Sequence, residues 1–216
     1  MPIAYSRKQS LNNTYNIDFR LINMIPLFEL VLNTDGGVSC ISLVDQPAME
    51  SGWLKLAKEP VSFVTLSAEK RILFGAILIP NKPILRINEA GEQYYIVFSK
   101  DTIEQIRNKY FQTQMGAELN AQHTATVKVN GFMVESFIKD SSRGMNPPEQ
   151  FKSLPDGTWF GAVKVEDDVI WNRFVANNVF TGFSIEGNFQ TKPVMDTSIL
   201  DKFQIYLDGL NNTTKK

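Results

Sequence analysis

Near its C-terminal end the chain reads Phe180-Thr181-Gly182-Phe183-Ser184-Ile185-Glu186-Gly187-Asn188-Phe189. Apolar and polar side chains alternate, which predicts an extended strand with Ser184 and Glu186 on the same face. Glycines inside a strand pattern, here Gly182 and Gly187, mark a bulge or a close approach of another backbone. A serine on a rigid strand between two glycines is a candidate nucleophile. The alternative is a polar serine on the solvated face of an ordinary strand.

A serine hydroxyl is a poor nucleophile unless a neighbouring base takes its proton. Imidazole suits this role because its pKa lies near neutral pH. The chain has one histidine, His123, so an imidazole base for Ser184 has no other candidate. The single cysteine, Cys40, is a second possible nucleophile for the same base. It ranks below Ser184 because it lies in the run Val38-Ser39-Cys40-Ile41, where a buried cysteine acting as a small apolar side chain is expected.

The composition describes an ordinary globular protein and excludes several functions. The chain has 216 residues, of which 43% are hydrophobic and 21% charged, which fits one domain or one domain with extensions. A net charge of −1 gives no basic surface for direct binding of nucleic acid or an anionic membrane. One cysteine excludes an internal disulfide and a cysteine-rich zinc site. We expect neither a cofactor nor a metal, and the acids Glu166-Asp167-Asp168 are interpreted as the first turn of a helix.

No part of the sequence reaches the roughly 18 to 20 apolar residues that a membrane span needs. The first 20 residues lack the apolar core of a signal peptide. We therefore expect a protein that resides in a reducing cytoplasm.

The pattern predicts seven or eight strands and two or three helices. The turn signal Asn33-Thr34-Asp35-Gly36-Gly37 predicts a hairpin between the first two strands. A helix capped by Ser99 or Asp101 should end before Gly116, and the strand that begins at Gly131 should pair back on the segment that carries His123. The expected strands are 28–32, 38–44, 71–79, 94–98, 131–139, 158–165 and the Ser184 stretch, and the other helices begin at Glu166 and span 197–206.

Strands that outnumber helices without strict alternation favour an α+β fold, mostly an antiparallel sheet or barrel with a few flanking helices. We divide the chain into a polar lead-in over residues 1–20, one domain over 21–195, and a C-terminal helix with a frayed tail over 196–216. Residues 140–155 form one long polar loop, and its part Ser141 to Gln150 is interpreted as a gating flap, a self-cleavage site or a plain linker.

Several pieces of the chain between Phe28 and Phe189, taken in order, resemble the XkdF-type serine proteases of tailed bacteriophages, a branch of the prohead maturation proteases. These pieces are Ile41 to Ala48, Phe74 to Arg86, Tyr94 to Ser99 with Thr102-Ile103, His123 followed by Val134-Glu135-Ser136, Leu154 to Trp159, Trp171, and Gly182 to Gly187. Because they occur in the same order, together they are more specific than any single motif.

The resemblance implies a fold like that of herpesvirus assemblin, a β-barrel ringed by helices. It implies an endopeptidase packaged inside the immature capsid in the host cytoplasm, where it cleaves the scaffold, segments of the major capsid protein, and itself. Self-association inside the shell is also implied. Histidine and serine carry the chemistry in this family, and these roles correspond to His123 and Ser184.

The third catalytic residue is less well defined by the sequence. Glu135 is the first choice, because its strand is expected beside His123 and an acid must orient the imidazole. Glu186 shares the face of Ser184 and either shapes the substrate groove or supplies the acid. Asp45 is a further alternative. It lies in the piece Ser42 to Ala48, which resembles a segment that follows the serine in the larger family. This order suggests the hypothesis that the chain is circularly permuted.

This permutation would place the strand Ile41 to Val44 beside the Ser184 strand. The position that corresponds to the family acid then falls near Cys40, which cannot replace a carboxylate. A missing acid supports a competing function, that of a non-enzymatic virion or capsid protein on the same fold. A hydrolase acting on small esters is a weaker alternative, because the chain lacks the Gly-x-Ser-x-Gly elbow of the α/β-hydrolases.

Overall fold

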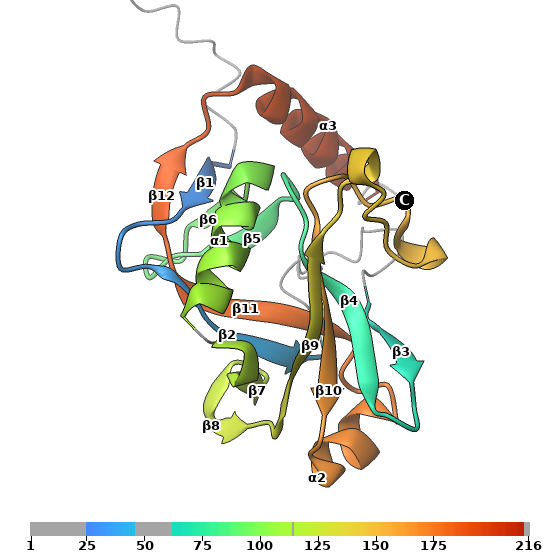
Figure 1. Ribbon diagram of the computed structural model, residues 1–216. Helices are drawn as coiled ribbons and strands as arrows, with labels where there is room; N and C mark the ends of the chain where they lie inside the picture. Colours follow the sequence, from blue (N-terminus) through green and yellow to red (C-terminus); the bar gives the residue numbers. More distant parts are fainter. Residues whose placement is uncertain (1–24, 46–61, 114, 214–216) are drawn as a thin grey trace, which may run out of the picture.

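The computed structural model describes residues 25–45, 62–113 and 115–213. Twelve strands in three four-stranded sheets, together with the helices, form the described part (Figure 1). The α+β prediction is therefore confirmed. The polar lead-in over 1–20 lies outside the described residues.

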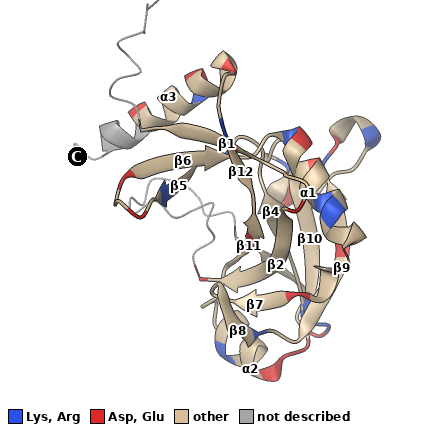
Figure 2. Cartoon of the chain, turned by 90° about the vertical axis from the view of Figure 1, so that its left-hand side faces the viewer, with Lys and Arg blue, Asp and Glu red and all other residues tan. Residues whose placement is uncertain are grey.

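The sheet that carries the Ser184 stretch has the order β11-β2-β7-β8. Its strands are β11 (Gly182–Asn188), β2 (Gly37–Val44), β7 (Leu119–Ala121) and β8 (Thr124–Lys128). β2 pairs antiparallel with β11 and parallel with β7. The predicted proximity of Ile41 to Val44 and the Ser184 strand is thus confirmed, although β2 is a central strand and not an edge. Figure 2 shows that β2 and β7 carry no charged side chains, whereas charges of both signs lie on helices and connections.

The second sheet has the order β3-β4-β10-β9 and supplies much of the core. Its strands are β3 (Val64–Ser67), β4 (Ile72–Leu78), β10 (Trp159–Val165) and β9 (Gly131–Ile138). The apolar run of β4 is buried along nearly its whole length, as the sequence predicts. The rings of Phe74 and Phe160 stack with centroids 5.5 Å apart. Trp159 and Trp171 are buried and contribute to the core.

The third sheet, β12-β1-β6-β5, is covered by the C-terminal helix α3 (Figure 1). Its strands are β12 (Gln190–Pro193), β1 (Leu27–Val31), β6 (Gln93–Val97) and β5 (Ile84–Ile87), and α3 spans Thr197–Thr213. Phe203 of α3 meets Tyr95 of β6 edge-to-face with centroids 5.0 Å apart. The helix is longer than the predicted range 197–206.

Helix α1 (Lys100–Gln112) begins and ends as predicted. The Ser99 hydroxyl accepts a hydrogen bond from the amide of Thr102, and Ile103, Ile106 and Tyr110 are buried. The acids of the next predicted helix are also placed as expected: Asp167 caps the short helix α2 (Asp168–Ile170). The remaining helical turns are η2 (Met115–Ala117), η3 (Ser141–Arg143), η4 (Glu149–Phe151) and the π-helical η5 (Trp171–Val175).

Two predicted strand pairings and the expected closed barrel are wrong. β1 and β2 do not form a hairpin, because β1 pairs with β12 and β6 in a different sheet. β9 pairs with β10 and not with the segment that carries His123. The described strands also form three open sheets with no closed barrel among them, so the fold does not reproduce the barrel that the resemblance to assemblin implies. In the two wrong pairings, the strands themselves lie roughly where the sequence places them, and only their partners differ.

Candidate active site

His123 contacts two polar side chains, Ser42 and Glu186, on one face of the β11-β2-β7-β8 sheet, and both of these bond Asn120. Its Nδ1 lies 3.1 Å from Oγ of Ser42 and 3.3 Å from Oε1 of Glu186. The Ser42 hydroxyl is also 2.5 Å from Oδ1 of Asn120 and 2.9 Å from Oε1 of Glu186. Nδ2 of Asn120 donates to the same Glu186 oxygen at 2.5 Å. This His–Ser–Asn–Glu group is called the polar cluster below.

Strand register explains how the cluster forms. Ser184 of β11 lies directly opposite Ser42 of β2, and Ser42 lies opposite Asn120 of β7. Residues opposite one another point to the same face of a sheet, with Cβ atoms of an antiparallel pair about 5 Å apart. Glu186, two residues after Ser184, therefore shares this face. Ser184, Ser42 and Asn120 are all nearly fully buried. Such burial is unusual for polar side chains that have no role in a hydrogen-bond network.

His123 is positioned by a tight turn between β7 and β8. Gln122 and His123 are both left-handed, each with φ of 54°. This matches a two-residue hairpin turn that normally carries Asn-Gly, and holding bulky residues there is unfavourable by about 1 to 3 kcal/mol each. The turn is tied to β2, because the amide of Gln122 donates to Leu43 O and the Gln122 side chain accepts from the amide of Asp45. Local strain of this kind concentrates at functional sites.

The Glu186 carboxylate is built to stay ionised. Partial burial works to raise its pKa, but hydrogen bonds from Asn120 and Ser42 and the charge of His123 outweigh burial, so the pKa lies below its ordinary value. The His123 and Glu186 side chains are 41% and 29% exposed. A carboxylate at Nδ1 is the arrangement that orients an imidazole base and stabilises the imidazolium formed during catalysis. The structure thus brings together His123 and Glu186, which the sequence offers only as an alternative acid.

Ser184 lies next to this group but is not joined to it. Its side chain is buried, and its Oγ has no hydrogen-bond partner among the described residues. The hydroxyl within hydrogen-bond reach of His123 is that of Ser42. A buried hydroxyl without a partner is unfavourable by about 1 to 3 kcal/mol. Such an exception in a folded protein calls for an explanation, and a role in chemistry is one.

Within the described residues, neither of the other two candidate acids bonds the imidazole. Glu135 is an exposed residue of β9 opposite Ala162, in the β3-β4-β10-β9 sheet, and none of its contacts within the described residues is with His123. The reason is the wrong strand pairing noted above. Asp45 follows β2, and its backbone contacts Gln122 and Thr181. The structure therefore favours Glu186 over both.

Cys40 is a poor nucleophile in this setting. Burial, Glu186 and Glu118 raise the pKa of its thiol to about 11, so the reactive thiolate is scarce at neutral pH. Cys40 pairs directly with Glu186 across β2 and β11. The family acid is expected near position 40, where this chain has a cysteine. Glu186, directly opposite on the neighbouring strand, places a carboxylate on the same face of the sheet.

Sequence reasoning did not assign a role to Ser42 or Asn120. Ser42 interrupts the apolar run from Ile41 to Val44, and a polar residue there is the one signal that could have drawn attention to it. Asn120 occupies the middle of a three-residue strand that is too short to show alternation. Both roles depend on strand register, which only the tertiary structure reveals.

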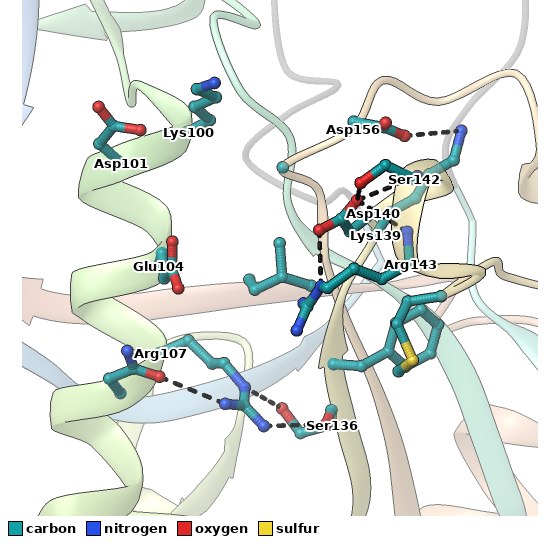
Figure 3. A pocket seen from close by; sticks show the side chains of 15 residues that line it. Lys100, Asp101, Glu104, Arg107, Ser136, Lys139, Asp140, Ser142, Arg143 and Asp156 are labelled. Atoms are coloured by element: carbon teal, nitrogen blue, oxygen red, sulfur yellow. Dashed lines mark hydrogen bonds and ion pairs between the residues drawn. The ribbon is translucent and has the colours of Figure 1, made fainter.

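A separate cleft of about 690 Å³ lies between α1 and the end of β9 with the loop after it (Figure 3). Its wall carries acids and bases in similar numbers, and many of these satisfy one another. Arg143 bonds Asp140 at 2.7 Å, Arg107 bonds Ser136 at 3.1 Å, and Lys139 lies 3.6 Å from Asp156. His123 is not among the residues that line this cleft. We place the candidate site at the polar cluster because its groups suit proton transfer.

No group of three or more histidine, cysteine or acidic side chains that could hold a metal ion occurs within residues 25–45, 62–113 and 115–213. Within the same ranges, no helix combines the length and apolar character needed to cross a membrane. In comparisons with protein-family models, curated proteins and solved structures, none matches this chain.

Proposed function

We propose that the protein is a serine endopeptidase in which Ser184 is the nucleophile, His123 the base and Glu186 the orienting acid. The observation that carries this proposal is the 3.3 Å contact between Nδ1 of His123 and Oε1 of Glu186, beside a buried serine whose hydroxyl has no partner within the described part of the chain. The imidazole would take the Ser184 proton, Ser184 Oγ would attack the peptide carbonyl, and water would then hydrolyse the acyl-enzyme.

Ser184 fits the nucleophile better than Ser42 does. In a catalytic triad the acid and the nucleophile use opposite nitrogens of the imidazole. Ser42 lies on Nδ1, the nitrogen that Glu186 occupies, and its proton is directed to Asn120 or Glu186. Ser184 lies opposite Ser42, and its hydroxyl makes no hydrogen bond to any residue that the structure describes. Reaction at Ser184 requires its hydroxyl to reach Nε2, through rotation of the serine side chain or of the ring when substrate binds.

The resemblance to prohead maturation proteases gives the proposed substrate. The enzyme would cleave scaffold and capsid-protein segments inside the immature phage head, in the host cytoplasm. The pairing of β2 with β11 supports this reading, because a permuted family member requires that proximity. The resemblance to assemblin extends only to the α+β character of the fold, because the sheets described here are open.

Labelling with a fluorophosphonate tests the proposal, since only an activated serine reacts. We expect the label on Ser184 in peptide mass mapping, and we expect Ser184→Ala to lose both the label and the cleavage of co-expressed scaffold, by on the order of 10⁶-fold in turnover. Ser42→Ala should keep the label on Ser184 but react more slowly. A label on Ser42 instead would show that Ser42, and not Ser184, is the nucleophile.

A non-enzymatic virion protein is the second candidate function. The observation in its favour is that Ser184 makes no hydrogen bond to His123 within the described residues. A wild-type protein that takes no fluorophosphonate and leaves scaffold and capsid protein uncut would support this function and overturn the peptidase.

A further inference from the structure

The Asn120 side chain is buried and is held at both ends within the polar cluster. It is 4% exposed, and both ends of its amide are used. Nδ2 donates to Glu186 Oε1, and Oδ1 accepts from the Ser42 hydroxyl. The opposite amide orientation would press an oxygen against the carboxylate and leave the NH₂ group facing Ser42. The donor and acceptor ends are therefore determined by the charge of Glu186.

This arrangement determines where the Ser42 proton points. A serine hydroxyl has one proton and two lone pairs. The neighbours of Ser42 Oγ on this side are Oδ1 of Asn120 and Oε1 of Glu186, and both only accept hydrogen bonds. The proton is directed to one of them, so a lone pair of Ser42 faces His123.

Within the described residues, both groups that contact Nδ1 of the imidazole then accept hydrogen bonds. The lone pair of Ser42 lies 3.1 Å away and the Glu186 oxygen 3.3 Å away. A ring nitrogen surrounded by acceptors carries the proton, and in a neutral imidazole the other nitrogen is then the base. Asn120 does not contact the imidazole itself. It acts on the ring through Ser42 and Glu186, which it bonds directly.

We infer that Asn120 is a positioning residue that holds the Glu186 carboxylate and, through Ser42, keeps the His123 proton on Nδ1, so that Nε2 is the basic nitrogen. Its catalytic consequence rests on the proposed peptidase function, but the effect on the tautomer does not. Loss of the amide should leave Glu186 free to rotate and Ser42 free to donate to the imidazole. The population of the Nε2-protonated tautomer should then rise.

Because the chain has one histidine, ¹⁵N NMR of histidine-labelled protein reports this tautomer from a single residue. We expect the neutral wild-type ring to be protonated on Nδ1, and Asn120→Ala to convert a measurable fraction to the Nε2-protonated form. In a scaffold-cleavage assay the same change should lower kcat/KM about 10- to 100-fold, the range seen when a partner that orients a functional ligand is removed. Asn108→Ala, at an exposed position of α1, is the matched control and should change neither reading.

Two further variants keep the test decisive if Asn120→Ala does not fold. Asn120→Leu fills a similar buried volume with a side chain that neither donates nor accepts a hydrogen bond, so it should raise the Nε2-protonated fraction as Asn120→Ala does. Ser42→Ala cuts the link to the ring while leaving the bond to Glu186, and should raise the Nε2-protonated fraction. An unchanged tautomer in folded Asn120→Ala or Ser42→Ala would overturn the inference. A shifted tautomer in a protein that neither labels nor cleaves would support the inference while the proposed function fails.

Discussion

At the scale of single residues, the proposed site combines buried polar side chains with a half-exposed imidazole. Ser42, Asn120 and Ser184 are nearly fully buried, and two of the three satisfy their polar atoms through one carboxylate. Burying polar groups is unfavourable unless they are hydrogen-bonded. The cluster is therefore stable only while Glu186 is ionised and accepts these bonds.

This dependence gives a pH signature for Glu186. Its pKa in the folded protein is lower than the ordinary value of 4.5, so its stabilising effect is complete above that pH and is lost as the pH falls through the folded-state pKa. We expect Glu186→Gln to lower the free energy of unfolding at pH 7, and this difference to shrink steadily below about pH 4.5. Urea unfolding of both proteins at pH 7 and pH 3 measures it.

Glu104→Gln is the control, because Glu104 is an exposed residue of α1. It should change the unfolding free energy little at either pH. A destabilisation by Glu186→Gln that is the same at both pH values would show that shape rather than charge accounts for the effect.

At the scale of elements, the site is made by the pairing of β11 with β2. The register of these strands shifts between Glu186 and Gly187. A Cβ built on Gly187 would lie 2.3 Å from the carbonyl oxygen of Gly37, which is closer than real atoms approach. The sequence predicts a bulge or close backbone approach at a glycine of this strand, and Gly187 confirms it. The bulge sits one residue after Glu186 and so helps to aim the carboxylate.

Gly187→Ala should therefore force the two backbones apart. We expect a loss of about 1 to 3 kcal/mol of folding free energy, the usual range for overpacking, together with weaker fluorophosphonate labelling because Glu186 is displaced. Thermal unfolding and labelling rates measure the two effects. Gly116→Ala is the matched control, since a Cβ there meets no atom within 4 Å. Equal stability of the two variants would contradict a tight contact at Gly187.

At the scale of the whole molecule, the candidate site and helix α3 belong to different sheets. The polar cluster occupies the β11-β2-β7-β8 sheet, whereas α3 packs through Phe203 on Tyr95 of the β12-β1-β6-β5 sheet. The buried phenylalanines of β4 and β10 form part of a continuous core. Stability and chemistry should therefore be separable by mutation.

Phe203→Ala tests this separation. Phe203 is 2% exposed, so its truncation should remove about 3 to 5 kcal/mol of folding free energy. At temperatures where the variant remains folded, fluorophosphonate labelling per folded molecule should match the wild type. Ile205→Ala, at a position 71% exposed on the same helix, should alter stability by less than about 0.5 kcal/mol. Loss of labelling in folded Phe203→Ala would show that the sheets are coupled.

The sequence by itself determined most of the local elements, and it drew attention to Ser184 and His123 as candidates for chemistry. Alternation placed β11, an apolar run placed β4, and a capping serine with helical spacing placed α1, because these patterns arise from neighbouring residues along the chain. His123 drew attention because it is the one histidine of the chain and so the one candidate for an imidazole base. Glu186 was also recognised as sharing the face of Ser184, which follows from the two-residue repeat of a strand.

Only the tertiary structure decided which strands meet. β2 beside β11 and β7 brings Ser42, Asn120 and Glu186 to His123, while β9 beside β10 carries Glu135 into another sheet. Strand pairing joins residues far apart in the chain, and its free energy depends on packing and on the hydrogen bonds of both partners together. A single strand does not encode its neighbour, so the contact of Glu186 with His123, the buried amide of Asn120 and the open sheets could be seen only once the chain was folded.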